Sequence, residues 1–218
     1  MKAFQEPLKQ LKESTQKRVC KLCFKDINPT SLFNLTHPNT SLCQNCFETL
    51  NFQPDSFIYR NTKITYLAKY EEPLSKLIIQ YKELNDFELR NIFLERYSLI
   101  LRLKYLNYKI VLVPSSKDNL KKRGFNHLEN MASILKLPIL DILEKENIEQ
   151  KTKNKIDRLN SQESFSLKEK IDLRKQNILL FDDIISTGAS FYACLKLIRQ
   201  LNPKKIEGLV IMRNKIQN

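Results

Sequence analysis

The segment from residue 177 to 190 constrains the fold more than any other part of the chain. An apolar run (NILLF, residues 177–181) has the composition of a buried strand and leads directly into two adjacent carboxylates. A loop of small residues follows, and a helix is expected from Ser190 to Leu201. Because open α/β sheets bind ligands at the carboxyl ends of their strands, functional side chains are expected just after residue 181.

Other apolar runs alternate with helical patterns on both sides of this segment. The expected strands lie near residues 57–59, 64–68, 110–113, 139–143 and 206–212. The expected helices cover residues 73–81, 86–106 and 125–135, and the polar stretch 144–176 is expected to be a long loop or flap with room for one helix. Strands separated by helices predict an α/β domain with a parallel sheet and helices on both faces.

Four of the five cysteines form two close pairs, Cys20-x2-Cys23 and Cys43-x2-Cys46, with 19 residues between the pairs. This spacing is typical of a structural zinc site, in which two turns supply four thiolates and close a tetrahedron. We predict a small zinc-finger module over residues 19–52, after a leader over 1–18 with a possible helix. The alternative is a redox pair, which needs only one such motif.

The chain is strongly basic, with 37 Lys and Arg against 24 Asp and Glu and a net charge of +13. Such a surface attracts phosphate groups, whether of a nucleic acid, a small ligand or an anionic membrane; the alternative is a merely soluble basic protein. No apolar run approaches the roughly 20 residues that cross a bilayer, and the N-terminus has no signal-peptide pattern. We therefore expect a cytoplasmic protein with reduced cysteines and no membrane insertion.

The loop after the two carboxylates has little side-chain bulk. Its backbone N–H groups can close around a phosphate, and the positive end of the following helix favours the same charge. Asp182 and Asp183 would be repelled by that phosphate, so a sugar hydroxyl or a Mg²⁺ ion is a better partner for them. The alternative is a strand that ends in an acidic turn and a helix cap.

The sequence Leu-Leu-Phe-Asp-Asp-Ile-Ile-Ser-Thr-Gly-Ala-Ser resembles the binding motif for 5-phosphoribosyl-1-pyrophosphate (PRPP) in type I phosphoribosyltransferases. The resemblance implies that Asp182 and Asp183 hold the ribose hydroxyls, with Mg²⁺ accompanying the PRPP. It places the 5-phosphate in the loop formed by Ser186, Thr187, Gly188, Ala189 and Ser190.

Further segments resemble the ComF family of competence proteins. They are Val111–Ser116, Leu120–His127, Arg158-Leu159-Asn160 with Phe165, Tyr81-Lys82 and the cysteine pairs. The resemblance implies a type I phosphoribosyltransferase-like domain over residues 53–218 behind the zinc finger, with a pyrophosphate loop at Pro114, Ser115, Ser116 and Lys117. It also implies a protein of natural transformation that binds incoming single-stranded DNA beside a competence helicase and other DNA-processing proteins.

Positive charge is concentrated in residues 101–125 and 196–218, which carry +6 and +5. This exceeds what a PRPP pocket needs and favours a longer polyanion, with aromatic side chains available to stack on unpaired bases. No duplex-reading motif is present, so single strands are the expected target. The candidate DNA contacts are Lys104, Lys121, Lys122, Arg123 and Phe125, and the alternative for the basic cluster is a solvated loop.

The sequence leaves catalysis open. Purine-salvage enzymes often carry an acidic residue where Ser186 stands, and the ComF family usually has Gln where His127 stands. No general base is identifiable, so three functions compete: a competence protein that binds DNA and PRPP, an active phosphoribosyltransferase acting on a base or another acceptor, and a PRPP-sensing regulator without catalysis.

Overall fold

The computed structural model describes residues 18–28, 30–38, 40–145 and 165–214, and it divides the chain into two compact units, residues 1–50 and 51–218. The predicted leader lies outside the described residues except for Arg18. Residues 146–164 of the predicted flap also lie outside them.

The first unit is built from two cysteine turns and two short helices, α2 (Leu32–Thr36) and α3 (Gln44–Thr49). Ser31 caps α2, because its Oγ accepts a hydrogen bond from the backbone N–H of Asn34 at 3.2 Å. Cys43 is the N-cap residue of α3. Apolar side chains such as Leu42 and Phe47 are buried beneath these turns.

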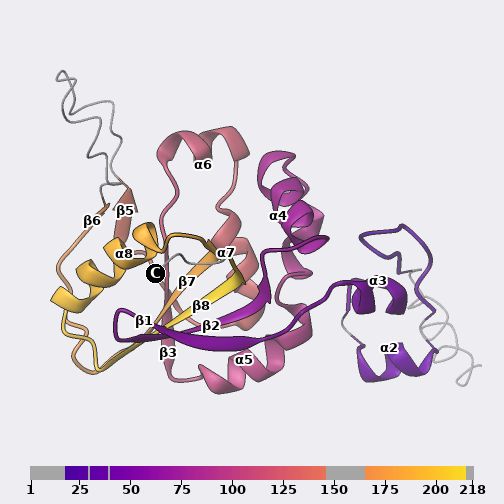
Figure 1. Cartoon of the computed structure of the whole chain (residues 1–218), viewed down its shortest axis with the longest axis horizontal. Coiled ribbons are helices and arrows are strands. Elements are labelled where there is room, and N and C mark those ends of the chain that lie inside the picture. The colour runs from indigo at the N-terminus through magenta and orange to yellow at the C-terminus, as the bar shows by residue number, and fades with distance from the viewer. Residues whose placement is uncertain (1–17, 29, 39, 146–164, 215–218) are drawn as a thin grey trace, which may run out of the picture. The chain divides into compact units, whose positions relative to one another are not determined.

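The second unit contains a six-stranded sheet with the order β1-β2-β8-β7-β3-β4 (Figure 1). Its strands are β1 (Asp55–Tyr59), β2 (Thr62–Lys69), β3 (Tyr108–Leu112), β4 (Ile139–Leu140), β7 (Asn177–Ile185) and β8 (Lys205–Arg213). Only β1 is antiparallel to its neighbour, and the Arg60–Asn61 turn that joins it to β2 has positive φ at both residues, as a two-residue hairpin requires. The predicted α/β class is confirmed, with one antiparallel strand at the edge.

Helices cover both faces of this sheet. Phe191 of α8 (Ala189–Gln200) packs so closely over Gly208 of β8 that a Cβ there would lie 2.7 Å from the phenyl ring. On the opposite face, α4 (Leu74–Glu83) and α7 (His127–Ala132) contact β7 through Lys82 and His127. The 3-10 turn η3 (Ser133–Leu135) extends α7.

The predicted long helix over residues 86–106 is wrong. The chain forms two 3-10 turns, η1 (Phe87–Asn91) and η2 (Glu95–Tyr97), before the short helix α5 (Ser98–Lys104). Ile92, Phe93 and Leu94 are consecutive and all buried, whereas an α-helix would spread three consecutive side chains over more than half its circumference.

Two other predictions need correction around the flap. The predicted strand 139–143 is split between β4 and β5 (Leu143–Lys145), and β5 pairs with β6 (Phe165–Leu167) in a separate two-stranded antiparallel sheet. Residues 117–123, for which a solvated loop was the alternative interpretation, form the helix α6. None of the helices in the described part of the chain has the length and apolar character to traverse a bilayer.

Candidate functional site

The site predicted from the sequence lies where β3 and β7 part from each other. Pro114 lacks an N–H group, and the last contact between the two strands is the hydrogen bond from Val113 N to Phe181 O at 3.0 Å. The chain leaves β7 toward β8 and leaves β3 toward β4, on opposite sides. Such a divergence marks the ligand-binding position of open α/β sheets.

The strand β7 runs four residues further than predicted. It ends at Ile185 rather than Phe181, because β8 continues to pair with it as far as Arg213. Asp182 and Asp183 therefore lie inside a strand and point to opposite faces of the sheet. Asp182 shares the face of Leu180 and α8, whereas Asp183 points toward α4 and α7.

The Asp183 carboxylate is only 5% exposed and is held by two donors. Its Oδ2 accepts from Lys82 Nζ at 2.7 Å and from His127 Nε2 at 2.9 Å. Burial alone would raise the pKa of Asp183, but the His127 hydrogen bond and the Lys82 charge outweigh it and hold this pKa well below its usual range. Asp183 is thus a permanently ionised group that is already bonded within the protein.

His127 is fixed in one tautomer by its two neighbours. Arg123 Nη1 donates to His127 Nδ1 at 3.3 Å, so Nε2 carries the hydrogen that Asp183 accepts. Burial lowers the pKa of His127 despite the opposing effect of Asp183, which keeps the ring neutral at pH 7. Because both ring nitrogens are engaged, His127 positions Asp183 and is not available as a general base.

Arg123 connects this network to α4. Its Nε donates to Lys82 O at 3.0 Å, and its Nη2 lies 3.1 Å from Glu83 Oε1. The Arg123 side chain is 8% exposed, so its guanidinium serves the interior rather than the surface. Arg123 was predicted to contact DNA, but its side chain instead contacts Glu83, Lys82 and His127.

The predicted phosphate loop joins β7 to the twelve-residue helix α8. Gly188 is the N-cap residue, with φ of +75°, and a Cβ at this position would lie 2.7 Å from the Tyr59 ring. Only glycine fits this backbone conformation and this approach. The Oγ1 of Thr187 accepts from Ala189 N at 3.3 Å, and the Tyr59 hydroxyl donates to Thr187 O at 3.4 Å. Ser186, Thr187 and Ala189 are exposed, so a ligand can reach the loop.

The predicted pyrophosphate loop follows β3 and runs into α6 (Lys117–Arg123). Ser116 caps this helix by accepting from Asn119 N at 3.2 Å, and Gly124 ends it with φ of +75°. This left-handed conformation, which glycine adopts readily, lets the chain turn sharply after α6. The two loops follow neighbouring strands, which brings Ser115, Ser116 and Lys117 to the same edge of the sheet as Thr187.

The structure does not bring the candidate DNA contacts together. Lys121 and Lys122 are exposed in the last turn of α6, and Lys122 Nζ lies 3.4 Å from Glu83 Oε2. Phe125 is half-buried between the rings of Tyr81 and Phe87.

Lys104 belongs to the other end of the sheet. It lies in α5, ahead of the first residue of β3, whereas α6 follows the last residue (Figure 1). Its Nζ donates to Thr65 Oγ1 at 3.0 Å.

The four paired cysteines of the first unit form a compact cluster. Their Sγ atoms all lie within 4.8 Å of one another, and Cys23 Sγ and Cys43 Sγ are 3.6 Å apart. Tetrahedral zinc with Zn–S bonds of about 2.3 Å requires S···S distances of about 3.8 Å, so the cluster fits a four-thiolate metal site. Backbone hydrogen bonds lower the pKa of Cys20 to about 7, against the effect of burial.

His37, between the two cysteine pairs, and the fifth cysteine, Cys194 in the second unit, both have structural surroundings. His37 stacks on Phe33 with ring centroids 4.7 Å apart, and its Nδ1 lies 2.9 Å from Thr36 Oγ1, so it is a structural residue of the loop and not a ligand. Cys194 is fully buried in α8.

Sequence reasoning missed Lys82 and Glu83 as parts of the site. The Tyr81-Lys82 pair was noted only for its resemblance to a ComF motif, and Glu83 carried no signal. Both lie at the end of α4, where the helix points its last turn at β7 and α6. A helical pattern predicts the helix, but not which neighbouring segment its end will contact.

Comparison with known proteins decides the family. A model of the phosphoribosyl transferase domain matches residues 101–218, which contain the two loops, both aspartates and His127. The chain belongs to this family. A competence protein ComFC of Streptococcus pneumoniae is 33% identical over 145 residues, which is 66% of this chain and 65% of that protein. The ComFC of Bacillus subtilis is 26% identical over 178 residues, or 80% of this chain and 73% of that protein.

The chain therefore spans slightly less than two thirds of the Streptococcus pneumoniae relative. Among solved structures, a hypoxanthine phosphoribosyltransferase of Staphylococcus aureus is similar with 9% identity and a TM-score of 0.39, covering 58% of this chain and 64% of that one. The phosphoribosyl transferase assignment rests on the family model.

Proposed function

We propose that this protein acts in natural transformation, a role that the name "competence protein" of its ComFC relatives supports. We further propose that it binds PRPP at the carboxyl ends of β3 and β7 and incoming single-stranded DNA on its basic surface. A competence helicase and other DNA-processing proteins are its proposed partners. The arrangement of the acid pair, the Gly188 loop and the positive end of α8 carries the PRPP part of this proposal.

We propose different roles for the two acids. The Asp183 carboxylate is buried and is held by both Lys82 and His127. Asp182 is half-buried on the face of α8, the helix that follows the phosphate loop, and its Oδ1 accepts a hydrogen bond from Asp183 N at 2.9 Å. Asp182 is therefore the proposed contact for the ribose hydroxyls and for the Mg²⁺ that accompanies PRPP. Ser186 through Ser190 would bind the 5-phosphate, and Ser115, Ser116 and Lys117 the pyrophosphate.

Calorimetric titration with PRPP and Mg²⁺ tests this site. The variant Asp182→Asn should bind PRPP at least about tenfold more weakly, since a charge-assisted hydrogen bond contributes about 1.5–3 kcal/mol. The variant Ala189→Glu, which adds a negative charge to the exposed loop, should abolish binding. Asp172→Asn removes an exposed carboxylate elsewhere and is the matched control. Unchanged PRPP affinity in both Asp182→Asn and Ala189→Glu would mean that PRPP binds elsewhere.

The side chains that we propose to contact DNA are the exposed lysines of α6. Lys121 and Lys122 lie at the end of α6, near the pyrophosphate loop, and Arg123 is excluded because its guanidinium is internal. The charge of +6 over residues 101–125 supports a polyanion partner, and the absence of a duplex-reading motif in the sequence favours single strands.

Salt titration of binding to a labelled single strand tests the lysines. Each phosphate contact contributes about −0.7 to the log–log slope, so Lys121→Ala with Lys122→Ala should make the slope shallower by about 1.4. Lys170→Ala with Lys175→Ala removes two exposed charges outside this region as a control. An unaltered slope in the first variant contradicts the site. Equal affinity for duplex would point to nonspecific electrostatic binding and favour the transferase alternative.

We also propose that the cysteine cluster holds one structural Zn²⁺. Four thiolate donors at suitable distances support zinc, and a complete shell of four leaves no position for substrate. Cys20, Cys23, Cys43 and Cys46 would bind the ion, and its binding free energy would stabilise the first unit.

The alternative function is phosphoribosyl transfer to a base or another acceptor. Membership of the phosphoribosyl transferase family supports it. The engagement of both His127 nitrogens and the serine at position 186 favour binding without transfer. A turnover assay that follows pyrophosphate release from PRPP with candidate bases distinguishes the two.

A further inference from the structure

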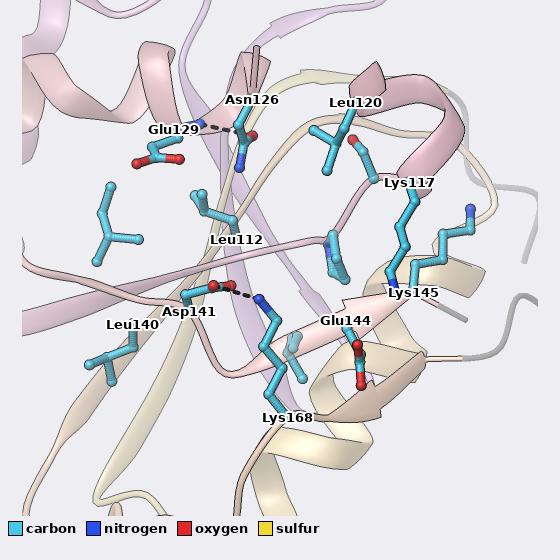
Figure 2. Close-up of a pocket in the computed structure, with 14 residues that line it drawn as sticks. Leu112, Lys117, Leu120, Asn126, Glu129, Leu140, Asp141, Glu144, Lys145 and Lys168 are labelled. Atoms are coloured by element: carbon cyan, nitrogen blue, oxygen red, sulfur yellow. Dashed lines mark hydrogen bonds and ion pairs between the residues drawn. The ribbon is translucent and has the colours of Figure 1, made fainter. Parts of the chain in front are cut away.

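A cavity of about 390 Å³ opens beside the proposed pyrophosphate loop (Figure 2). Its walls come from β3 and the following loop, from α6 and α7, from the strands β4 and β5, and from Lys168, which directly follows β6. None of residues 182–190 lines it. This volume lies within the range of small-molecule sites, which is about 300–1,000 Å³.

The cavity combines an apolar floor with charges of both signs. Leu112, Ile139 and Leu140 are only half-buried and leave apolar surface facing the open space. Two of the carboxylates are already engaged: Asp141 Oδ2 lies 2.5 Å from Lys168 Nζ, and Glu144 Oε1 accepts from Ser166 Oγ at 3.4 Å.

Two charged groups of the lining remain without a partner among the described residues. The Glu129 carboxylate and the Lys117 ammonium make no hydrogen bond or ion pair there, although both line the cavity. They lie on different sides of it, with Asn126 next to Glu129 and with Lys145 next to Lys117 (Figure 2). The Asn126 Oδ1 accepts from Glu129 N at 3.3 Å, which leaves the Asn126 amide nitrogen as a donor.

We infer that this cavity binds a nucleotide with a guanine base, distinct from PRPP. A carboxylate accepts two hydrogen bonds side by side, which matches the adjacent N1–H and N2–H₂ donors of guanine, and the Asn126 amide can donate to O6. The apolar floor receives the flat base. The phosphate of the nucleotide lies toward Lys117. Lys168, which pairs with Asp141 in the structure, can pair with this phosphate instead.

This ligand is not the acceptor of a phosphoribosyl transfer. An acceptor attacks the ribose from the side opposite the departing pyrophosphate, whereas the cavity shares Ser115 and Lys117 with the proposed pyrophosphate loop. The site therefore goes beyond the proposed function, as a second ligand site, for a guanine nucleotide, beside the proposed pyrophosphate loop. The source is either free guanosine monophosphate or the 5′-phosphorylated guanine end of a DNA strand.

Calorimetric titration with guanosine monophosphate tests the inference on the full-length chain. The variant Ala189→Glu blocks the phosphate loop and should leave this affinity unchanged. Glu129→Gln should weaken binding at least about tenfold, because it replaces one acceptor with a donor and removes the charge. Glu169→Gln, which makes the same change outside the cavity, is the control. Adenosine monophosphate, which lacks the paired donors, should bind at least about tenfold more weakly than guanosine monophosphate.

Three results would overturn the inference: no binding of guanosine monophosphate to the wild type at millimolar concentration, loss of binding in Ala189→Glu, or full affinity in Glu129→Gln. Parallel PRPP titrations keep the proposals separable, since Glu129→Gln should bind PRPP normally. A decamer with a 5′-phosphorylated guanine, compared with the same strand bearing a 5′ thymine, separates the two sources: a preference for the guanine end that disappears in Glu129→Gln identifies the DNA end. No such preference leaves the free nucleotide as the ligand.

Discussion

The cysteine cluster and the network around Asp183, which lies near the carboxyl ends of β3 and β7, are assembled in contrasting ways. The cluster draws all four sulfurs from two local turns in one short unit, and each turn contributes two cysteine thiols. The network around Asp183 brings together side chains that are far apart in the sequence: Asp183 and His127 are separated by 56 positions, and Arg123 and Lys82 by 41. A local motif can be recognised by its spacing, whereas a network between elements depends on how they pack.

The two regions also differ in what an isolated change should do. The cluster acts as one unit, because a metal site that loses one of four ligands loses most of its affinity. At the end of β7, Asp182 is half-buried whereas Asp183 is buried, so the two acids should respond differently to the same substitution. The predictions below test this contrast.

The largest effect is expected in the cluster. Cys43→Ser should reduce zinc content from one ion per chain to near zero and unfold the first unit, since structural zinc supplies about 10–16 kcal/mol of binding free energy in zinc-finger peptides. Elemental analysis and hydrogen exchange measure the two effects, with Cys194→Ala as the control that retains zinc. Wild-type protein prepared without chelator and found free of zinc would refute the metal site.

A smaller effect is expected at Asp183. Asp183→Ala should lower the free energy of unfolding by about 3–5 kcal/mol, because it leaves Lys82 without its buried partner. Asp182→Ala should cost about 1 kcal/mol or less and act chiefly on PRPP affinity. Denaturant unfolding of the two variants measures the difference. Equal losses of stability would mean that the two acids do not have separate roles.

The smallest effect concerns pH. Because folding lowers the pKa of His127, the unfolded state binds a proton more readily, and stability should fall as the pH drops below about 6.5, by at most about 1.4 kcal/mol per pH unit. The lowered pKa of Asp183 acts in a different window: its contribution is complete above about pH 5 and declines progressively as the pH falls below about 4 toward the lowered pKa of the folded state.

His127→Gln should therefore flatten the decline between pH 7 and pH 5 without removing the loss below pH 4. Thermal unfolding across this range measures it, and His37→Gln in the other unit is the control. An identical decline in His127→Gln would assign the effect to another group.

The sequence alone determined the features that depend on local order. The spacing of the cysteines predicted their cluster, the small residues after Asp183 predicted the loop that contains Gly188, and the alternation of strands and helices predicted the α/β class. Each follows from a period or a backbone conformation that neighbouring residues impose.

The tertiary structure decided which face, partner and end of the sheet each side chain received. The strand β7 extends four residues further than predicted, so Asp182 and Asp183 point to opposite faces of the sheet. The Arg123 side chain is largely buried and contacts Glu83 and His127. A side chain in a strand alternates between faces with every residue, so an extended boundary changes its surroundings completely. Contacts between distant segments depend on packing that local sequence patterns do not encode.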